Sequence, residues 1–334
     1  MRLPHSPSGA VPPYDPELEA ALALTVPSIS SITAADIPAI RENDRAAALA
    51  ACSELREAGM ITRDVVVTAA DGVPLEMSIV HGPHPAASSP VIFYIHGGAM
   101  ILGTRWSGHE LFAGWIEKYN AIVATLEYRL APEHPYPTPQ EDCYSALVWL
   151  GSHLQEFGWG PSIALIAGSS GGGGLAASVT MMARDRGGPE VRGQLLLAPM
   201  LDDRNDSVSS RQYPSGLWNA VENEMAWRAI LDRAQDESDH LLPARAEDLS
   251  GLPPTFIEAG SAEVFRDECV AFASRLWAAG VHAELHVWAG AFHGFDIHRH
   301  TSVAQGALNS RHNWMDRTLG ITSRTSLGAS TLTP

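Results

Sequence analysis

The stretch Ile163-Ala164-Leu165-Ile166-Ala167-Gly168-Ser169-Ser170-Gly171-Gly172 decides the fold. Its five leading apolar residues predict a buried strand, and a helical pattern then runs from about Gly172 to Gly187. Between them lies Gly-x-Ser-x-Gly, which is typical of a sharp strand-to-helix turn that lifts the serine to the carboxyl edge of a sheet. A serine hydroxyl is a weak nucleophile and needs a base within reach. We therefore expect Ser170 to be a nucleophile.

Two other interpretations of this turn stay open on these residues alone. Glycine-rich strand-to-helix turns also occur in dinucleotide-binding folds, and residues 172–177 fit the pattern G-x-G-x-x-A. A turn with a purely structural role is the second alternative. The sequence contains no G-x-x-x-x-G-K-[ST] phosphate loop. Further segments are needed to choose among these interpretations.

Composition bounds the class of protein. The 334 residues carry 22 Lys and Arg against 38 Asp and Glu, and the resulting net charge of −16 argues against nucleic acid or a membrane as partner. At 45% hydrophobic residues, the chain can bury a large core. Its three widely spaced cysteines make neither a disulfide framework nor a metal-ligand pattern. With no targeting or membrane-spanning pattern, we expect a cytoplasmic protein without cofactor or metal.

After the first sixty residues, short apolar runs alternate with helical patterns. The runs predict strands near 65–67, 75–80, 91–95, 121–126, 163–167, 195–198, 255–258 and 283–288. Such strands joined by helices are typical of a mostly parallel sheet covered on both faces, with the first two strands as a hairpin. The helical N-terminus and residues 202–249 do not fit the alternation. Asp36 and Thr138 are expected to cap the helices that follow them.

Two further segments supply what a serine nucleophile needs. The predicted strand at 91–95 leads into His96-Gly97-Gly98-Ala99, where glycine leaves backbone N–H groups free to converge on one point. With the N–H of Gly171, these groups would form an oxyanion hole, whereas a tight turn is the alternative; His96 itself has a structural role in both interpretations. Of 14 histidines, His293 lies on a loop just after the last predicted strand, which suits a general base. His298 and His300 are expected to be exposed rather than a metal pair.

These segments resemble, in the same order, the motifs of the hormone-sensitive lipase family of α/β-hydrolases, the bacterial carboxylesterases. The resemblance covers roughly residues 61–295. It rests on His96-Gly97-Gly98, on Tyr-Arg-Leu-Ala-Pro-Glu-His-Pro at 128–135, on the turn at Ser170, on residues 260–268 and on Phe-His-Gly-Phe at 292–295. It implies an α/β-hydrolase fold, with a mostly parallel sheet of about eight strands flanked by helices and covered by a helical cap. It also implies the catalytic order serine, acid, histidine.

The chain departs from the family's pattern around the expected site. Ser169 and Gly171 stand where the family usually has Asp and Ala, and Ala99 replaces the third glycine of the oxyanion loop. The acid segment, usually Asp-x-Leu-Arg-Asp-Glu, reads Glu263-Val-Phe-Arg-Asp-Glu268 here, so the resemblance assigns the acid role to Glu263. Asp267 is the alternative acid, although capping of the following helix suits it better.

Three other residues of the family's motifs, Arg129, Glu133 and His134, are interpreted as structural ties below the oxyanion loop. The cap that the resemblance implies divides the chain into an N-terminal cap part at 1–60, core segments at 61–201 and 250–320, a cap insertion at 202–249 and a loose tail at 321–334. Leu217, Trp218 and Trp227 could line the entrance to the site, or they could belong to the core.

The interpretation that follows is a serine carboxylesterase with Ser170, Glu263 and His293 as the catalytic residues. The N–H groups of Gly97, Gly98, Ala99 and Gly171 are the oxyanion candidates. The substrate would be a small ester, and the family suggests short to medium acyl chains. An amidase or lactonase with the same triad and a non-catalytic binding protein are the alternatives. A dinucleotide enzyme would leave the segments at 96–98 and 292–294 unexplained. The last strand, at 283–288, could pair two copies in a homodimer.

Overall fold

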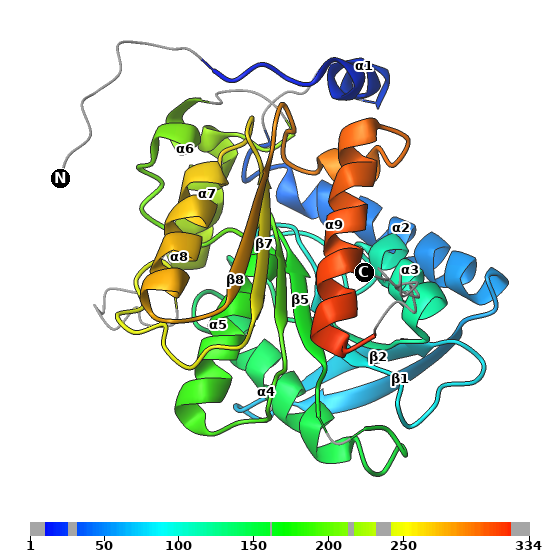
Figure 1. The fold of residues 1–334 in the computed structure, drawn as a ribbon. Coiled ribbons are helices and arrows are strands. Elements are labelled where there is room, and N and C mark those ends of the chain that lie inside the picture. Colours follow the sequence, from blue (N-terminus) through cyan, green and yellow to red (C-terminus); the bar gives the residue numbers. More distant parts are fainter. Residues whose placement is uncertain (1–10, 26–31, 161, 213–216, 232–241, 322–334) are drawn as a thin grey trace, which may run out of the picture.

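The structure is a computed structural model and describes residues 11–25, 32–160, 162–212, 217–231 and 242–321 (Figure 1). Its centre is an eight-stranded sheet in the order β1-β2-β4-β3-β5-β6-β7-β8. The strands are β1 Ile61–Thr68, β2 Pro74–His81, β3 Val91–Ile95, β4 Ile122–Leu126, β5 Leu165–Ser169, β6 Gln194–Leu197, β7 Thr255–Gly260 and β8 Ala283–Trp288. β2 pairs antiparallel with both β1 and β4, and the other neighbours are parallel. The expected mostly parallel sheet with a hairpin at one edge is confirmed.

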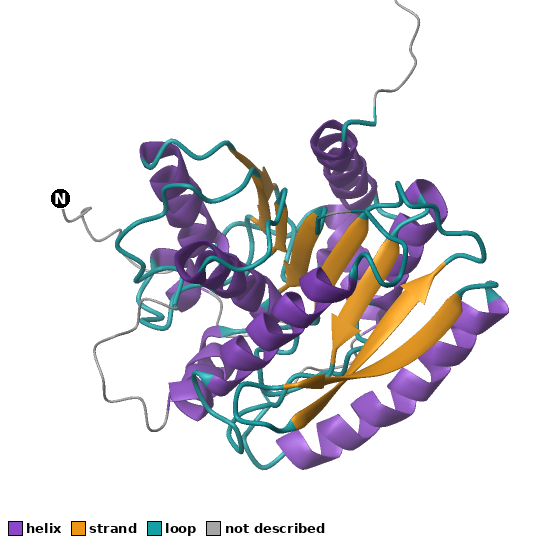
Figure 2. Ribbon diagram, turned by 90° about the horizontal axis from the view of Figure 1, so that it is seen from below, coloured by secondary structure: helices purple, strands orange, loops and turns teal. Residues whose placement is uncertain are grey.

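Helices cover both faces of this sheet (Figure 2). One face packs against α4 Thr138–His153, α5 Gly171–Arg186 and α8 Arg266–Ala278. The other packs against α3 His109–Tyr119, α9 Ser302–Leu319 and the C-terminal half of α2 Ile37–Glu57. β3 and β4 are buried along their whole length, and apart from Thr125 their side chains are apolar on both faces rather than alternating.

The parallel strands bring distant loops to one edge of the sheet. The carboxyl ends of β3, β5, β7 and β8 lie at Ile95, Ser169, Gly260 and Trp288, and each is followed by one of the expected site segments. In parallel α/β sheets, ligands bind outside the carboxyl ends of the strands. The topology therefore brings the four segments together at one edge, although they lie far apart in the sequence.

The two segments that did not fit the alternation of strands and helices form further helices. The N-terminal segment forms α1 Pro16–Thr25 and α2, and the segment after β6 forms α6 Val208–Gln212 and α7 Ala220–Leu231. α1 lies above the carboxyl edge of the sheet (Figure 1). The division into cap and core at residues 60, 201 and 249 stays a prediction, and residues 322–334 of the expected tail lie outside the described part of the chain.

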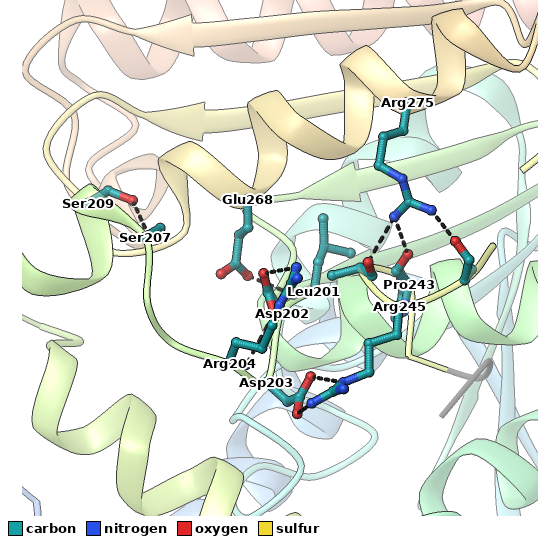
Figure 3. Close-up of polar contacts among 12 residues, drawn as sticks. Leu201, Asp202, Asp203, Arg204, Ser207, Ser209, Pro243, Arg245, Glu268 and Arg275 are labelled. Carbon is teal, nitrogen blue, oxygen red and sulfur yellow. Dashed lines mark hydrogen bonds and ion pairs between the residues drawn. The ribbon is translucent and has the colours of Figure 1, made fainter. Parts of the chain in front are cut away.

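Two arginine side chains, one from α8 and one from the segment itself, fasten the end of the segment at 202–249 (Figure 3). Arg275 of α8 donates to the carbonyl oxygens of Pro243 and Ala244 at 3.2 and 2.9 Å. Arg245 binds the carboxylate of Asp203 through two nitrogens, at 2.7 and 2.6 Å. These contacts join both ends of the segment to each other and to α8.

Neither of the two predicted helix caps makes its capping hydrogen bond. Asp36 stands at the N-cap position of α2, but its backbone is helical and its carboxylate accepts hydrogen bonds from Thr33 instead of capping the helix. Thr138 is the first residue of α4 rather than the residue before it. The N–H of Glu141, which a Thr138 hydroxyl would bind in a capping box, donates to the carbonyl oxygen of Pro137 at 3.0 Å.

Candidate active site

Ser170 occupies a strained turn between β5 and α5. Its backbone has φ 57° and ψ −123°, a conformation that a side chain disfavours. Three N–H groups, from residues 173, 174 and 200, donate to its carbonyl oxygen at 3.0–3.1 Å, and its own N–H donates to the carbonyl oxygen of Leu197 at 2.8 Å. These bonds hold the strained backbone in place. The hydroxyl therefore stands at the N-terminus of α5, where the helix dipole favours negative charge.

The glycines around Ser170 make room for neighbouring backbone. A Cβ on Gly168 would lie 2.1 Å from the carbonyl oxygen of Gly172, and one on Gly172 would lie 2.3 Å from that of His96. A Cβ on Gly174 would lie 2.0 Å from the carbonyl oxygen of Met200. The space beside these glycines, where a dinucleotide would bind in the alternative interpretation, is thus occupied by the protein's own backbone.

His293 and Glu263 form a hydrogen-bonded line with Ser170. The Nε2 of His293 lies 3.0 Å from the Oγ of Ser170, and its Nδ1 lies 2.6 Å from Oε2 of Glu263. The other carboxylate oxygen of Glu263 accepts the N–H of Gly260 at 2.5 Å. The Glu263 side chain is fully buried, whereas that of His293 is 15% exposed. This is the geometry of a serine activated by an oriented histidine.

Asp267, the alternative acid, binds elsewhere. Its Oδ2 accepts the N–H of Ser209 at 2.8 Å, and its Oδ1 accepts from Arg266 at the same distance. The residue lies in the first turn of α8, whose cap residue is Phe265, so the expected capping role is wrong. Asp267 instead joins α8 to α6.

The loop after β3 presents backbone N–H groups beside Ser170. Gly98, Ala99 and Met100 have φ of 106°, 50° and 59°, and the carbonyl oxygen of Gly98 accepts the N–H of Ile101 and Leu102 at 3.0 and 2.8 Å. A Cβ on Gly97 would lie 3.4 Å from that of Ser170. A Cβ on Gly171 would lie 2.8 Å from the nitrogen of Ala99, so loop and turn are in contact. The loop that carries the predicted oxyanion donors therefore lies against the turn at Ser170, and the role of these donors stays a prediction.

The histidine of this loop lies beneath it. His96 is fully buried, its ring stacks on Tyr128 at 4.2 Å, and its Nδ1 lies 2.7 Å from the carbonyl oxygen of Gly97. Burial lowers the pKa of His96, because the charged imidazolium would lose its hydration. A neutral ring that supports the loop fits the structural role that we expected.

The other residues of the motif at 128–135 make ion pairs or lie exposed. Arg129 binds the buried carboxylate of Asp142 through two nitrogens, at 2.9 and 2.6 Å, and reaches Asp71 at 2.7 Å. Glu133 pairs with Arg41 at 2.9 Å, while His134 is exposed. These contacts connect the loop after β4 to β1–β2 and to α2.

The three proposed entrance residues separate into two groups. Leu217 packs against the small cluster of Leu18, Phe292 and Phe295, and thus lies beside the His293 loop. Trp218 is 9% exposed and Trp227 is 3% exposed, and both belong to the main hydrophobic core. Their role in binding substrate stays a prediction.

Sequence reasoning missed several residues that hold the site. Arg41 and Asp44 of α2 contact the oxyanion loop, and Arg311 of α9 links Asp296, three residues after His293, to Glu258 of β7. Glu268, the last residue of the acid motif, is buried and accepts the N–H of Leu201 at 2.7 Å (Figure 3). None of these roles has a local signal, because each partner lies on another element or loop, far from the residue along the chain.

Within the described ranges, no helix is long and apolar enough to cross a membrane. The same ranges contain no group of three or more His, Cys, Asp or Glu side chains placed to hold a metal ion.

The eight-stranded sheet and the geometry at Ser170 define an α/β-hydrolase. A profile of the alpha/beta hydrolase fold matches residues 92–297, more than half of the chain, and the chain belongs to that family. The resemblance to its hormone-sensitive lipase branch is confirmed. Carboxylesterase NlhH of Mycobacterium tuberculosis is 36% identical over 221 residues, which cover 62% of this chain and 66% of that protein. Carboxylic ester hydrolase LipN of the same species is 34% identical over 222 residues, which cover 64% and 59%.

The chain thus spans less than two thirds of the length of these curated relatives. Solved structures match over more of their length. A bacterial heroin esterase has a TM-score of 0.84 and 34% identity, covering 92% of this chain and 98% of that one. Esterase LipW of Mycobacterium marinum has a TM-score of 0.81 and 32% identity, with the same coverage. The comparisons therefore agree with the fold that the sheet topology shows, and they include esterases among the chain's relatives.

Proposed function

We propose that this protein is a serine carboxylesterase that uses Ser170, His293 and Glu263 as a catalytic triad. One observation carries the proposal: Oγ of Ser170, the ring of His293 and the carboxylate of Glu263 lie in one line with contacts of 3.0 and 2.6 Å. Relatives named carboxylesterase and carboxylic ester hydrolase support ester hydrolysis.

The proposed reaction has two halves. Ser170 attacks the ester carbonyl while His293 Nε2 takes its proton and passes it to the leaving alcohol, which yields an acyl-enzyme. Water then attacks the acyl group by the same proton route. Glu263 keeps the proton of the ring on Nδ1 and stabilises the imidazolium. The N–H groups of Gly98 and Gly171 hold the negative oxygen, together with that of Ala99 or of Gly97. Each donor contributes about 3 kcal/mol in comparable sites.

The proposed substrates are esters with short to medium acyl chains, as the family suggests. An amidase or lactonase would use the same groups, so a panel of p-nitrophenyl esters of increasing length, anilides and lactones separates these activities. A binding protein without turnover is less well supported, since all three side chains are present and in contact.

Replacement of the nucleophile tests the proposal. Ser170→Ala is expected to lower turnover of p-nitrophenyl acetate and butyrate by about 10⁴-fold or more, because the attacking atom is removed. The melting temperature of the variant and its unchanged circular dichroism serve as the control for folding. A fluorophosphonate should label the unmodified protein at Ser170, as located by mass spectrometry. Turnover retained in Ser170→Ala would contradict the proposal.

Two further expectations belong here as proposals. β8 pairs with β7 on one side, and within the described residues no strand pairs with its other side, so two copies could pair through it. Light scattering of the purified protein at micromolar concentration should give twice the mass of one chain, and a monomer there would exclude this pairing. A cytoplasmic location is tested by cell fractionation.

A further inference from the structure

The oxyanion loop, residues 97–103, carries unusual backbone strain. Three of its consecutive residues have positive φ, and two of them, Ala99 and Met100, are not glycine. Such a conformation persists only where the surroundings hold it in place. The loop's own hydrogen bonds, from Ile101 and Leu102 to Gly98, close one turn but do not attach that turn to the rest of the protein.

A helix outside the sheet supplies the attachment. Arg41 of α2 donates from Nε to the carbonyl oxygen of Ile101 at 2.9 Å. One turn further along the same helix, Asp44 Oδ2 accepts the N–H of Gly103 at 2.9 Å. The loop is therefore bound at a carbonyl and at an N–H, by side chains of opposite charge on one face of α2.

Arg41 also reaches the loop by a second route. Its Nη2 donates to the carbonyl oxygen of Ala131 at 2.6 Å, and the N–H of Ala131 donates to the carbonyl oxygen of Met100 at 2.9 Å. The remaining nitrogen binds both carboxylate oxygens of Glu133 at 2.9 Å. The Arg41 side chain is 15% exposed, so water competes weakly for these acceptors. Ile37, one turn earlier, packs in the same hydrophobic cluster as Met100 and Ile101.

We propose that Arg41 and Asp44 are positioning residues for the oxyanion hole: α2 holds the strained loop so that the N–H groups of Gly98 and Ala99 point at the reacting carbonyl oxygen. This inference rests on the proposed function. Neither side chain touches the reacting atoms. Their effect is exerted through Ile101, Gly103 and Ala131, and it places part of the catalytic geometry under the control of a helix that precedes the first strand of the sheet.

The test separates positioning from folding by comparing variants on one helix. Arg41→Met removes every bond of the guanidinium and keeps most of the side chain's volume. Arg45→Met is the matched control, since Arg45 lies on the same helix, is 66% exposed and pairs only with the exposed Glu42 among the described residues. Asp44→Ala removes the acceptor for Gly103, whereas Asp44→Asn retains a carbonyl oxygen that can accept the same N–H.

The readouts are kcat and KM for p-nitrophenyl butyrate, with active sites counted by fluorophosphonate titration, and the affinity for a trifluoromethyl ketone, whose adduct carries the same oxyanion. Displaced donors weaken only the transition state, so Arg41→Met should lower kcat per active site by about 10- to 100-fold with little change in KM. Its affinity for the ketone should fall by a similar factor. Arg45→Met should match the unmodified protein, and Asp44→Asn should lose less than Asp44→Ala.

Counting active sites makes the outcomes distinct. If Arg41→Met retains the kcat per titrated site of the unmodified protein, or if KM rises while kcat stays constant, the inference is overturned. If Arg41→Met does not fold, the two Asp44 variants decide, and equal kcat in both would overturn it. An unmodified protein that reacts with neither ester nor fluorophosphonate would overturn the proposed function, and this inference with it.

Discussion

Gly171 and Ala99 are in backbone contact across the candidate site: a Cβ built on Gly171 would lie 2.7 Å from the Cα of Ala99 and 2.9 Å from the nitrogen of Met100. These two positions are also two of the departures from the family's pattern, which usually has Ala in the turn and Gly in the loop. Relative to the family's pattern, the glycine and the alanine have changed places between two positions that touch in the structure. A methyl group in the turn would meet a loop whose own residue has less backbone freedom than glycine.

The contact predicts a compensating pair of substitutions. Gly171→Ala should lower kcat by about 10²-fold, because the added methyl displaces the oxyanion loop. The double variant with Ala99→Gly should recover part of this loss, since glycine tolerates the positive φ and lets the loop move. A double-mutant cycle on p-nitrophenyl butyrate measures the coupling. Additive effects would show that the loop and the turn adjust independently.

The acid of the triad is tested by two carboxamide substitutions. Glu263→Gln should lower kcat by about 10⁴-fold, because an amide no longer holds the histidine in the required tautomer or stabilises its charge. Asp267→Asn, which alters the bond to Ser209, should leave kcat close to that of the unmodified protein. Steady-state kinetics on the two variants makes the comparison. A severe loss in Asp267→Asn alone would reverse the assignment.

The ion pair below the loop predicts a large change in stability. Asp142 has no exposed surface and is neutralised by Arg129, so Arg129→Met should lower the free energy of unfolding by about 3–5 kcal/mol. Arg186→Met is the matched control, because Arg186 pairs with the neighbouring Glu141 while 39% exposed, and should cost at most about 1 kcal/mol. Urea unfolding measures both. Equal losses would mean that burial of Asp142 does not govern the effect.

Glu268 should make stability depend on pH in one direction. Burial raises the pKa of its carboxyl well above the usual range, and the negative charge of Asp202 adds to this, although the N–H of Leu201 opposes it. Because the folded pKa exceeds the unfolded one, the stabilising contribution is complete at acidic pH and is lost as pH rises through the folded pKa. Unmodified protein should therefore lose stability relative to Glu268→Gln between about pH 5 and pH 8.

Urea unfolding of both proteins at several pH values measures the difference, in which other titrating groups cancel. The Glu268→Gln variant is a close control, since the amide oxygen of the new side chain can still accept the N–H of Leu201. A constant difference between the two proteins over this range would contradict the raised pKa.

Much of the fold could be predicted because its signals are local. The buried strands are continuous apolar runs, and the rule that parallel strands end at one edge brings Ser170, Glu263 and His293 together from positions far apart in sequence. The contacts between their side chains agree with that expectation. The roles of these residues in catalysis stay a prediction until the variants are assayed.

What could not be predicted depends on long-range contacts. The exposure expected for His298 is wrong, because its ring packs edge-on against Phe292 and is 4% exposed. Arg41 lies in an amphipathic helix whose sequence pattern is common to surface helices, so the pattern does not reveal its role. Its partners at 101 and 131 follow sixty and ninety residues later. The capping bonds are absent because Thr33 binds the carboxylate of Asp36 and because the carbonyl oxygen of Pro137 accepts the N–H of Glu141.

The glycine run around Ser170 has a practical consequence for engineering. A Cβ added at Gly168, Gly172 or Gly174 would lie 2.0–2.3 Å from a carbonyl oxygen, so backbone packs closely around the nucleophile. Libraries that randomise these positions will therefore return misfolded proteins. Laboratory evolution of new selectivity will have to draw on side chains at other positions, such as Leu217, which packs beside the loop of His293.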